Sequence, residues 1–269
     1  MPMSWLNKFF KFRERADGDL VKPFLEHMED LRWTIIKMAV SLVSAMIFAF
    51  SFRTDLMRVL QAPLEKVDPS LPGQLIITDV AGSFTLSLTL AFYCGIVLAL
   101  PFLLYFVAGF VLPALTRHEK KYLFPGILAG FLLFVAGVLV CYHYILPETL
   151  SFFFHDAQKM QIKTMWTWNK YASFCSWLTI GFGLLCELPV AVVVLAFLGI
   201  LDFPFLSRTR PYAYTIILIL SAIVAPTPDP VTFISLGFPV IVLYECCIWI
   251  VWLIDQRRRK RAARDAAED

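Results

Sequence analysis

A carboxylate in the middle of an apolar segment is the group best placed to do chemistry in this chain. Glu187 is the single charged residue between Tyr171 and Leu201. Taking an unpaired carboxylate to the centre of a bilayer costs several kcal/mol, so Glu187 needs a partner inside the protein, a water-lined cavity or a proton. We therefore expect Glu187 to mark an intramembrane polar site, together with Pro189, which interrupts the helix beside it.

The composition explains why such a segment belongs in a membrane. Hydrophobic residues make up 59% of the 269 residues and charged residues 17%, which is too apolar for a water-soluble protein. A spanning helix needs about 20 apolar residues, and the gaps between charges accommodate six such helices. The predicted fold class is all-α, a polytopic membrane protein with six transmembrane helices at about residues 33–52, 83–112, 122–146, 171–199, 211–225 and 231–254.

The distribution of Lys and Arg predicts the orientation of these helices. Seventeen of the 24 cationic residues lie in segments on the same side as both termini, and six lie on the other side. Cytoplasmic loops retain positive charge, so we expect both termini to be cytoplasmic. The chain then divides into a cytoplasmic N-terminal segment (1–32), a transmembrane domain (33–254) and a basic cytoplasmic tail (255–269). We interpret the run from Arg257 to Arg261 as a topology determinant and not as a nucleic-acid site.

The predicted bundle has short and bent helices. The fifth span is limited to Pro211 to Ala225, and its length of about 22 Å is less than the bilayer core of about 30 Å. The sixth has only fourteen uncharged residues before Glu245, so we expect it to be short as well. Prolines bend helices and favour a concave kinked-helix bundle; they stand at Pro101, Pro113, Pro125, Pro189 and Pro239.

Other short patterns indicate packing and not catalysis. Gly126, Gly130 and Gly137 predict close approach of the third span to a neighbour. The six cysteines lie in apolar segments, and neither they nor the four histidines have the spacing of a metal site. The sequence has no Walker A loop, and no His is convincingly placed opposite Ser83. We therefore expect no enzyme activity, no metal and no cofactor.

Two acidic motifs lie in segments predicted to be cytoplasmic. They are His27-Met28-Glu29-Asp30-Leu31-Arg32, before the first span, and Pro113-Ala114-Leu115-Thr116-Arg117-His118-Glu119-Lys120-Lys121, after the second. Here the chain resembles the TatC family, the multispanning subunit of the twin-arginine protein translocase. That family has His-x-x-Glu-Leu-Arg at the first position and Pro-Ala-Leu-x-x-His-Glu at the second.

The resemblance extends from about Phe24 to Asp255. It continues through Ala62-Pro63-Leu64, Thr78-Asp79-Val80, Phe182-Gly183, Glu187-Leu188-Pro189-Val190-Ala191, Arg210-Pro211-Tyr212, Pro226-Thr227-Pro228-Asp229 and Tyr244-Glu245. The sequence departs from the family at two positions. Asp30 stands where the family usually has Glu, and Val231-Thr232-Phe233 lacks the Gln that often follows the Asp of the proline-rich loop.

The resemblance implies a signal-peptide receptor and core component of a translocase. Such a translocase exports folded proteins with twin-arginine signal peptides, driven by the proton-motive force, across a bacterial-type inner membrane. The implied partners are these signal peptides, small single-span translocase subunits, the lipid bilayer and further copies of the chain in a homo-oligomeric working complex. Nucleic acid is not an implied partner.

The signal-peptide site follows from the chemistry of the guanidinium group. Arginine pairs with carboxylates through forked, charge-assisted hydrogen bonds, so the expected twin-arginine site combines carboxylates with motif neighbours: Glu119, Asp30, Glu29, Arg32 and His118. An exposed ion pair contributes only about 0 to 1 kcal/mol. Apolar contacts must add affinity, and we expect the hydrophobic part of the signal peptide to lie near Pro101 and Phe110.

The remaining predictions concern partner contacts. We expect Glu187 to hold a polar end of the inserted signal hairpin or a polar residue of a partner subunit. The short fifth and sixth spans form the predicted docking edge near Thr215 and Val231. The predicted loop residues on the far side of the membrane are Pro63, Asp79, Pro226, Pro228 and Asp229.

Two other classes of protein remain as alternatives. In a proton-coupled secondary transporter, Glu187 would carry a proton and contact substrate in a midplane site. That class predicts inverted repeats, and the first and last three spans show no convincing correspondence. A structural membrane scaffold, in contrast, would tolerate replacement of both Glu187 and Glu119.

Overall fold

The computed structural model describes residues 24–111, 120–162, 165–197, 201–225 and 230–268, and over these ranges the chain is helical without any β-strand. The helices are α2 (Phe24–Ser51), α3 (Arg53–Val67), η1 (Leu71–Gln74), α4 (Gly82–Val111), α5 (Lys120–Val140), η3 (Cys141–Ile145), α6 (Leu146–Lys159), α7 (Trp168–Leu185), α8 (Glu187–Phe197), α9 (Phe203–Arg208), α10 (Arg210–Val224) and α11 (Pro230–Glu268). The all-α prediction is confirmed for this part of the chain.

Within the described residues, five helical stretches are long and apolar enough to cross a membrane. They are Met28–Ser51, Gly82–Phe110, Phe124–Lys159, Trp168–Ala196 and Thr232–Gln256, and the shorter apolar helix Arg210–Val224 follows the fourth of them. The short fifth segment therefore agrees with the sequence. Six crossings would require α10 to cross as well, and that number stays a prediction, as do the cytoplasmic position of both termini and the concave shape.

The expectation of a short sixth span is wrong. The apolar stretch Thr232–Gln256 has 25 residues, and the helix runs through Glu245 without interruption. Glu245 does not end the span because Arg210 and Tyr214 of α10 contact its carboxylate. A charge with partners inside the protein is compatible with a membrane helix.

The third span is also longer than predicted. We expected it to end near residue 146, but the helical stretch continues to Lys159. A π-helical turn over Cys141–Ile145 joins α5 to α6, and the Leu146 N–H donates to the carbonyl of Cys141, five residues earlier. Pro147 lies in the first turn of α6, where its missing N–H is tolerated. The π turn thus allows the helix to continue past a proline.

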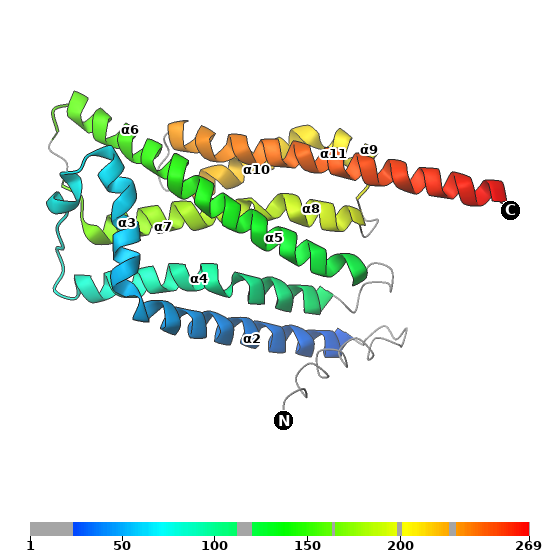
Figure 1. The fold of residues 1–269 in the computed structure, drawn as a ribbon, viewed down its shortest axis with the longest axis horizontal. Helices are drawn as coiled ribbons and strands as arrows, with labels where there is room; N and C mark the ends of the chain where they lie inside the picture. The colour runs from blue at the N-terminus through cyan, green and yellow to red at the C-terminus, as the bar shows by residue number, and fades with distance from the viewer. Residues whose placement is uncertain (1–23, 112–119, 163–164, 198–200, 226–229, 269) are drawn as a thin grey trace.

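The long helices run side by side, and their ends gather at two faces (Figure 1). The start of α2, the end of α4, the start of α5 and the end of α8 lie at one end of the bundle, where α11 also extends outward. The short α3 lies across the opposite end, near the end of α6 and the start of α7. Segments that are distant in sequence, including the beginnings of α2 and α5, are therefore brought to the same end.

The core of the bundle is centred on α7. Only 6% of the apolar stretch of α2 is buried inside the protein, against 44% for the stretch formed by α7 and α8. Phe134 of α5 and Phe182 of α7 are among the largest fully buried side chains, and Leu236 and Ile248 of α11 are also fully buried. The first helix is peripheral: it packs mainly on α4, with a backbone approach so close that a Cβ at Gly95 would lie 3.0 Å from the Met46 backbone.

The glycines of α5 form the predicted close-packing face. A Cβ on Gly126 would lie 3.2 Å from Val194 of α8, and one on Gly137 would lie 2.7 Å from the Cys186 sulfur. Gly130, between them, faces Glu187. The prediction that this stripe packs against a neighbouring helix is confirmed, because only a residue without a side chain leaves this space.

Candidate functional site

Glu187 stands directly after an interruption in the fourth span. The N–H of Cys186 donates to the carbonyls of Phe182 and Gly183, which closes α7, and α8 begins at Glu187. Pro189 is fully buried and has no N–H, so the carbonyl of Leu185 has no helical donor at position 189. The chain therefore opens its helix at the point where it carries its intramembrane carboxylate.

The Glu187 carboxylate lies against the backbone of α5. A Cβ built on Gly130 would be 2.8 Å from Glu187 Oε2 and 3.5 Å from Oε1. Glu187 Oε1 is buried and accepts no hydrogen bond from any described residue. A buried acceptor without a donor costs about 1–3 kcal/mol, so this oxygen is a point at which a donor from another molecule would be stabilised.

The acidic residues of the first motif occupy the opening turns of α2. Glu29 and Arg32 are exposed and Asp30 is half-buried. The Thr34 hydroxyl donates to the Asp30 carbonyl at 2.7 Å, within the helix. The opening turns of α2, which carry these residues, lie at the end of the bundle where α4 finishes and α5 begins (Figure 1).

Two members of the predicted twin-arginine site lie outside the described residues. They are His118 and Glu119, in the segment between α4 and α5. The helices on either side of that segment, α4 ending at Val111 and α5 starting at Lys120, are both described. The end of α4, the start of α5 and the opening turns of α2 lie at one end of the bundle.

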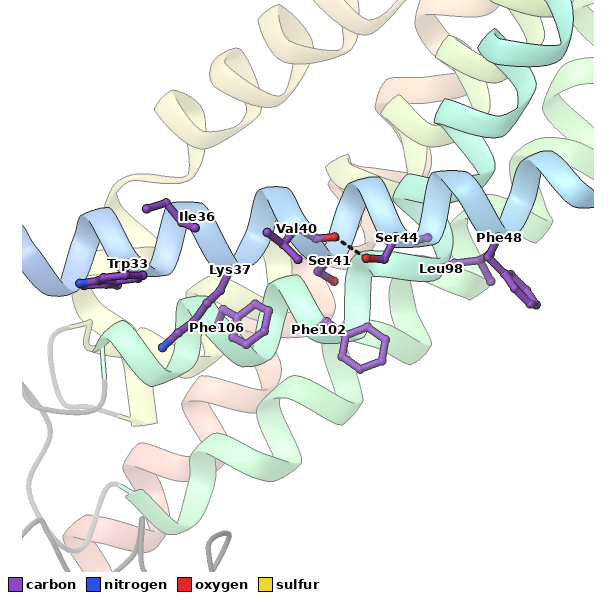
Figure 2. A pocket seen from close by; sticks show the side chains of 11 residues that line it. Trp33, Ile36, Lys37, Val40, Ser41, Ser44, Phe48, Leu98, Phe102 and Phe106 are labelled. Carbon is purple, nitrogen blue, oxygen red and sulfur yellow. Dashed lines mark hydrogen bonds between the residues drawn. The ribbon is translucent and has the colours of Figure 1, made fainter. Parts of the chain in front are cut away.

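The predicted hydrophobic groove residues lie on α4. Pro101 is half-buried inside the helix, which continues past it, and Phe110 is half-buried near the end. A groove is present beside them, between α2 and α4 (Figure 2), and its α4 wall consists of Leu98, Phe102 and Phe106. Phe110 continues this four-residue spacing but, like Pro101, does not line the groove.

Pro63 occupies a position that anchors α3. A proline at position 63 cannot donate to the Val59 carbonyl four residues earlier, and the Tyr142 hydroxyl donates to that carbonyl at 2.6 Å. The Tyr171 hydroxyl donates to the next carbonyl, Leu60, at 2.8 Å. Pro63 itself is fully buried, so its role in the described structure is to free a carbonyl that fixes α3 to the bundle.

The other predicted loop and docking residues are dispersed. Asp79 is exposed, and its carbonyl accepts the Gly82 N–H at the start of α4. The loop before it is tied to the segment preceding α7 by a parallel bridge between Ile76 and Thr167.

Thr215, from the predicted docking edge, is exposed on α10. Val231 lies in the first turn of α11, and Pro226, Pro228 and Asp229 lie outside the described residues.

A polar cluster between α10 and α11 was missed by the sequence analysis. Arg210 Nη2 lies 3.3 Å from Glu245 Oε2, and the Tyr214 hydroxyl donates to the other oxygen of that carboxylate. Arg210 Nε is buried without a hydrogen-bond partner among the described residues. The sequence did contain a signal for this pair. Arg210 stands at the start of one apolar segment and Glu245 lies inside the next, so each charge needed a partner.

The described residues offer little for metal chemistry. No group of three or more His, Cys, Asp or Glu side chains within these ranges is arranged to hold a metal ion. All six cysteines are free thiols. The chemistry available at Glu29, Asp30 and Glu187 is recognition of donors and cations.

Comparison with known proteins gives a consistent family. A family model described as Sec-independent protein translocase protein (TatC) matches residues 26–239. The chain is 39% identical over 186 residues to the TatC protein of Akkermansia muciniphila, covering 69% of this chain and 53%, about half, of that relative. It is 32% identical over 225 residues to that of Deinococcus radiodurans, covering 83% of each.

The fold agrees with the same family. A crystal structure described as a twin arginine translocase receptor, TatC, superposes with a TM-score of 0.73 at 28% identity, over 84% of this chain and 98% of that chain. The chloroplastic TatC protein of Pisum sativum is 28% identical over 245 residues, covering 90% of this chain and 66% of that relative. The chain therefore belongs to the TatC family and is a membrane protein of the Sec-independent protein translocase type.

Proposed function

We propose that the chain is the signal-peptide receptor and core component of a translocase that exports folded proteins with twin-arginine signal peptides. Transport is driven by the proton-motive force across a bacterial-type inner membrane, with both termini in the cytoplasm. The observation that carries the proposal is the position of Glu29 and Asp30 at the end of the bundle where α4 finishes and α5 begins. Membership in a translocase family supports it.

The carboxylates of Glu29, Asp30 and Glu119 are suited to binding a pair of guanidinium groups. Each guanidinium donates two parallel hydrogen bonds to one carboxylate, a geometry that Lys does not reproduce. Glu29 is exposed and Asp30 is half-buried, and Glu119 belongs to the motif between α4 and α5. One arginine would pair with Glu119 and the other with Asp30 or Glu29, and His118 and Arg32 would flank them.

The Glu187 carboxylate serves a second contact deeper in the membrane. It is nine residues from Ala196, the end of the apolar stretch on the cytoplasmic side, which corresponds to about 14 Å of helix. Its buried Oε1 has no donor among the described residues. A polar group from the inserted signal hairpin, or from one of the small single-span subunits, would supply that hydrogen bond.

The experiment that tests the cytoplasmic site is site-specific crosslinking. A signal peptide with a photoreactive group beside its paired arginines should crosslink to the membrane-embedded chain next to position 119, and Glu119→Gln should remove most of this product. The matched control is Glu65→Gln, which removes an exposed carboxylate from α3 at the opposite end of the bundle. Undiminished crosslinking in Glu119→Gln, or equal loss in both variants, would reject the assignment.

A proton-coupled secondary transporter is the second candidate. The observation that favours it is the half-buried Glu187, whose Oε1 accepts no hydrogen bond from the described part of the chain. The two functions differ at the cytoplasmic face, because a transporter centred on Glu187 does not require Glu119. A Glu119→Gln variant that lost signal crosslinking would therefore exclude a transporter as the sole function.

A further inference from the structure

We propose that the groove between α2 and α4 binds an anionic phospholipid of the leaflet nearest the start of α2. An acyl chain would lie along the groove, and the phosphate would pair with the Lys37 ammonium. The two helices approach closely at Gly95 and Met46, and the groove extends from this seam toward the start of α2. The identification of that leaflet as cytoplasmic depends on the proposed function, while the binding site itself does not.

The groove is apolar along nearly its whole length. It has a volume of about 670 Å³ and is lined by Trp33, Ile36, Lys37, Val40, Ser41, Ser44, Ala45, Phe48, Leu98, Phe102 and Phe106. The Ser44 hydroxyl donates to the Val40 carbonyl at 2.8 Å, as the dashed line in Figure 2 shows, so its proton is used inside the helix. The lining of the groove is therefore suited to a hydrocarbon chain.

Lys37 is the charged group of the groove. Figure 2 shows its side chain directed along the groove beside Phe106, toward the end where Trp33 lies. Among the described residues, no carboxylate lies within ion-pair distance of its ammonium. The nearest acid on α2 is Asp30, seven residues earlier, which is about 10 Å along the helix axis. A cation within an apolar stretch is stabilised by reaching an anionic headgroup at the interface.

The length of the groove matches one leaflet. Its α2 wall extends from Trp33 to Phe48, which is about 22 Å of helix. One leaflet contributes about 15 Å of hydrocarbon, half of the 30 Å core, and the remainder reaches the headgroup region. A transmembrane helix of a second protein would need a surface about 30 Å long, so a lipid fits the groove better.

The sign of the charge separates this groove from the signal-peptide site. Lys37 repels guanidinium groups, whereas Glu29 and Asp30 attract them, and the two sets of side chains are on the same helix. A cation at the rim favours an anionic occupant over a segment next to two arginines. The occupant is therefore anionic at the Lys37 end and apolar beyond it.

Native mass spectrometry of the purified full chain tests the proposal. After incubation with dioleoylphosphatidylglycerol or dioleoylphosphatidylcholine, the chain should retain the anionic lipid about tenfold better. Lys37→Gln should reduce retention of the anionic lipid to that of the zwitterionic one, and Lys37→Arg should restore the preference. Lys66→Gln, which removes an exposed cation on α3, should leave the preference intact.

A second variant tests the groove itself. Ser44 is exposed on the lining wall, so Ser44→Phe fills the groove without disturbing the core and should lower retention of both lipids. Equal retention of the two lipids by the parent chain, or an unchanged preference in Lys37→Gln, would overturn the proposal. Covalent dimers formed by Ser44→Cys but not by the parent chain would also overturn it, since they would identify a second copy as the occupant. Signal-peptide crosslinking measured on Lys37→Gln separates this outcome from failure of the proposed function.

Discussion

The Glu187 carboxylate rests on Gly130, so close that a methyl group at position 130 would lie 2.8 Å from Oε2. The two residues come from α8 and α5, and the same glycine face also accommodates Val194 and Cys186. A position without a side chain is thus required opposite the intramembrane carboxylate. The site can therefore be disturbed in two ways, by replacing Glu187 or by adding a side chain at Gly130.

Replacing Glu187 tests whether transport requires its carboxylate to accept a hydrogen bond. Glu187→Ala removes a buried oxygen that has no hydrogen-bond donor in the described ranges, so the protein should insert normally and be slightly more stable, by about 1 kcal/mol. Export of a twin-arginine substrate into inverted vesicles should fall about tenfold, equivalent to about 1.4 kcal/mol. Full export by this variant would remove Glu187 from the mechanism.

Adding a methyl group at Gly130 should displace the carboxylate without unfolding the bundle. The atom that must move is the end of the flexible Glu187 side chain, and Ala is about 1 kcal/mol better than Gly in a helix. Gly130→Ala should therefore retain thermal stability and lose export to a similar degree as Glu187→Ala. Gly109→Ala is the matched control, because no described atom beyond its chain neighbours and the surrounding helix backbone lies within 4 Å of a Cβ there; it should export normally. Wild-type export by Gly130→Ala would show that the position of the carboxylate is unimportant.

The hydrogen bond from Tyr142 to Val59 should stabilise α3 only because Pro63 leaves that carbonyl free. Tyr142→Phe should lower the free energy of unfolding by about 1 kcal/mol, and the loss should be smaller in a Pro63→Ala background, where the new N–H bonds Val59. Thermal unfolding of the four proteins in detergent measures this coupling. Tyr144→Phe serves as the control, since Tyr144 is 74% exposed. Equal losses in both backgrounds would contradict the assignment.

The Arg210–Glu245 pair should contribute modestly to the contact between α10 and α11. The two side chains are 37% and 30% exposed, so we expect a coupling free energy of about 1 kcal/mol in a double-mutant cycle of Arg210→Gln and Glu245→Gln. The exposed pair Arg58–Asp55, at 81% and 61%, should give a coupling close to zero. Denaturation in mixed micelles provides the measurement, and similar coupling in both pairs would show that the partial burial has no effect.

The membrane helices were predictable where charge and hydrophobicity agree. The first, second and fourth spans, and the glycine face of α5, follow from local pattern alone. Glu187 could be identified from the sequence because a lone carboxylate in an apolar membrane segment is energetically costly. Its contact with Gly130 joins two spans and is a property of the assembled bundle.

Two of the differences depend on residues that are distant in the sequence, and the third is a local irregularity of the helix. The helix of the predicted sixth span continues through Glu245, whose carboxylate pairs with Arg210 and accepts a hydrogen bond from Tyr214, 35 and 31 residues earlier. The third span passes Pro147 by means of a π turn that no local propensity indicates. The hydrogen bond from Tyr142 to the Val59 carbonyl, which Pro63 leaves without a helical donor, joins residues 83 apart in the sequence. Each of these partners is visible only once the helices are packed.

Binding of signal peptides to the purified chain tests the central claim most directly. A peptide with paired arginines should bind at least tenfold more tightly than the same peptide with paired lysines, and Glu119→Gln combined with Asp30→Asn should abolish this difference while leaving residual apolar binding. Equal affinity for the two peptides, or an arginine preference that survives the double substitution, would contradict the account.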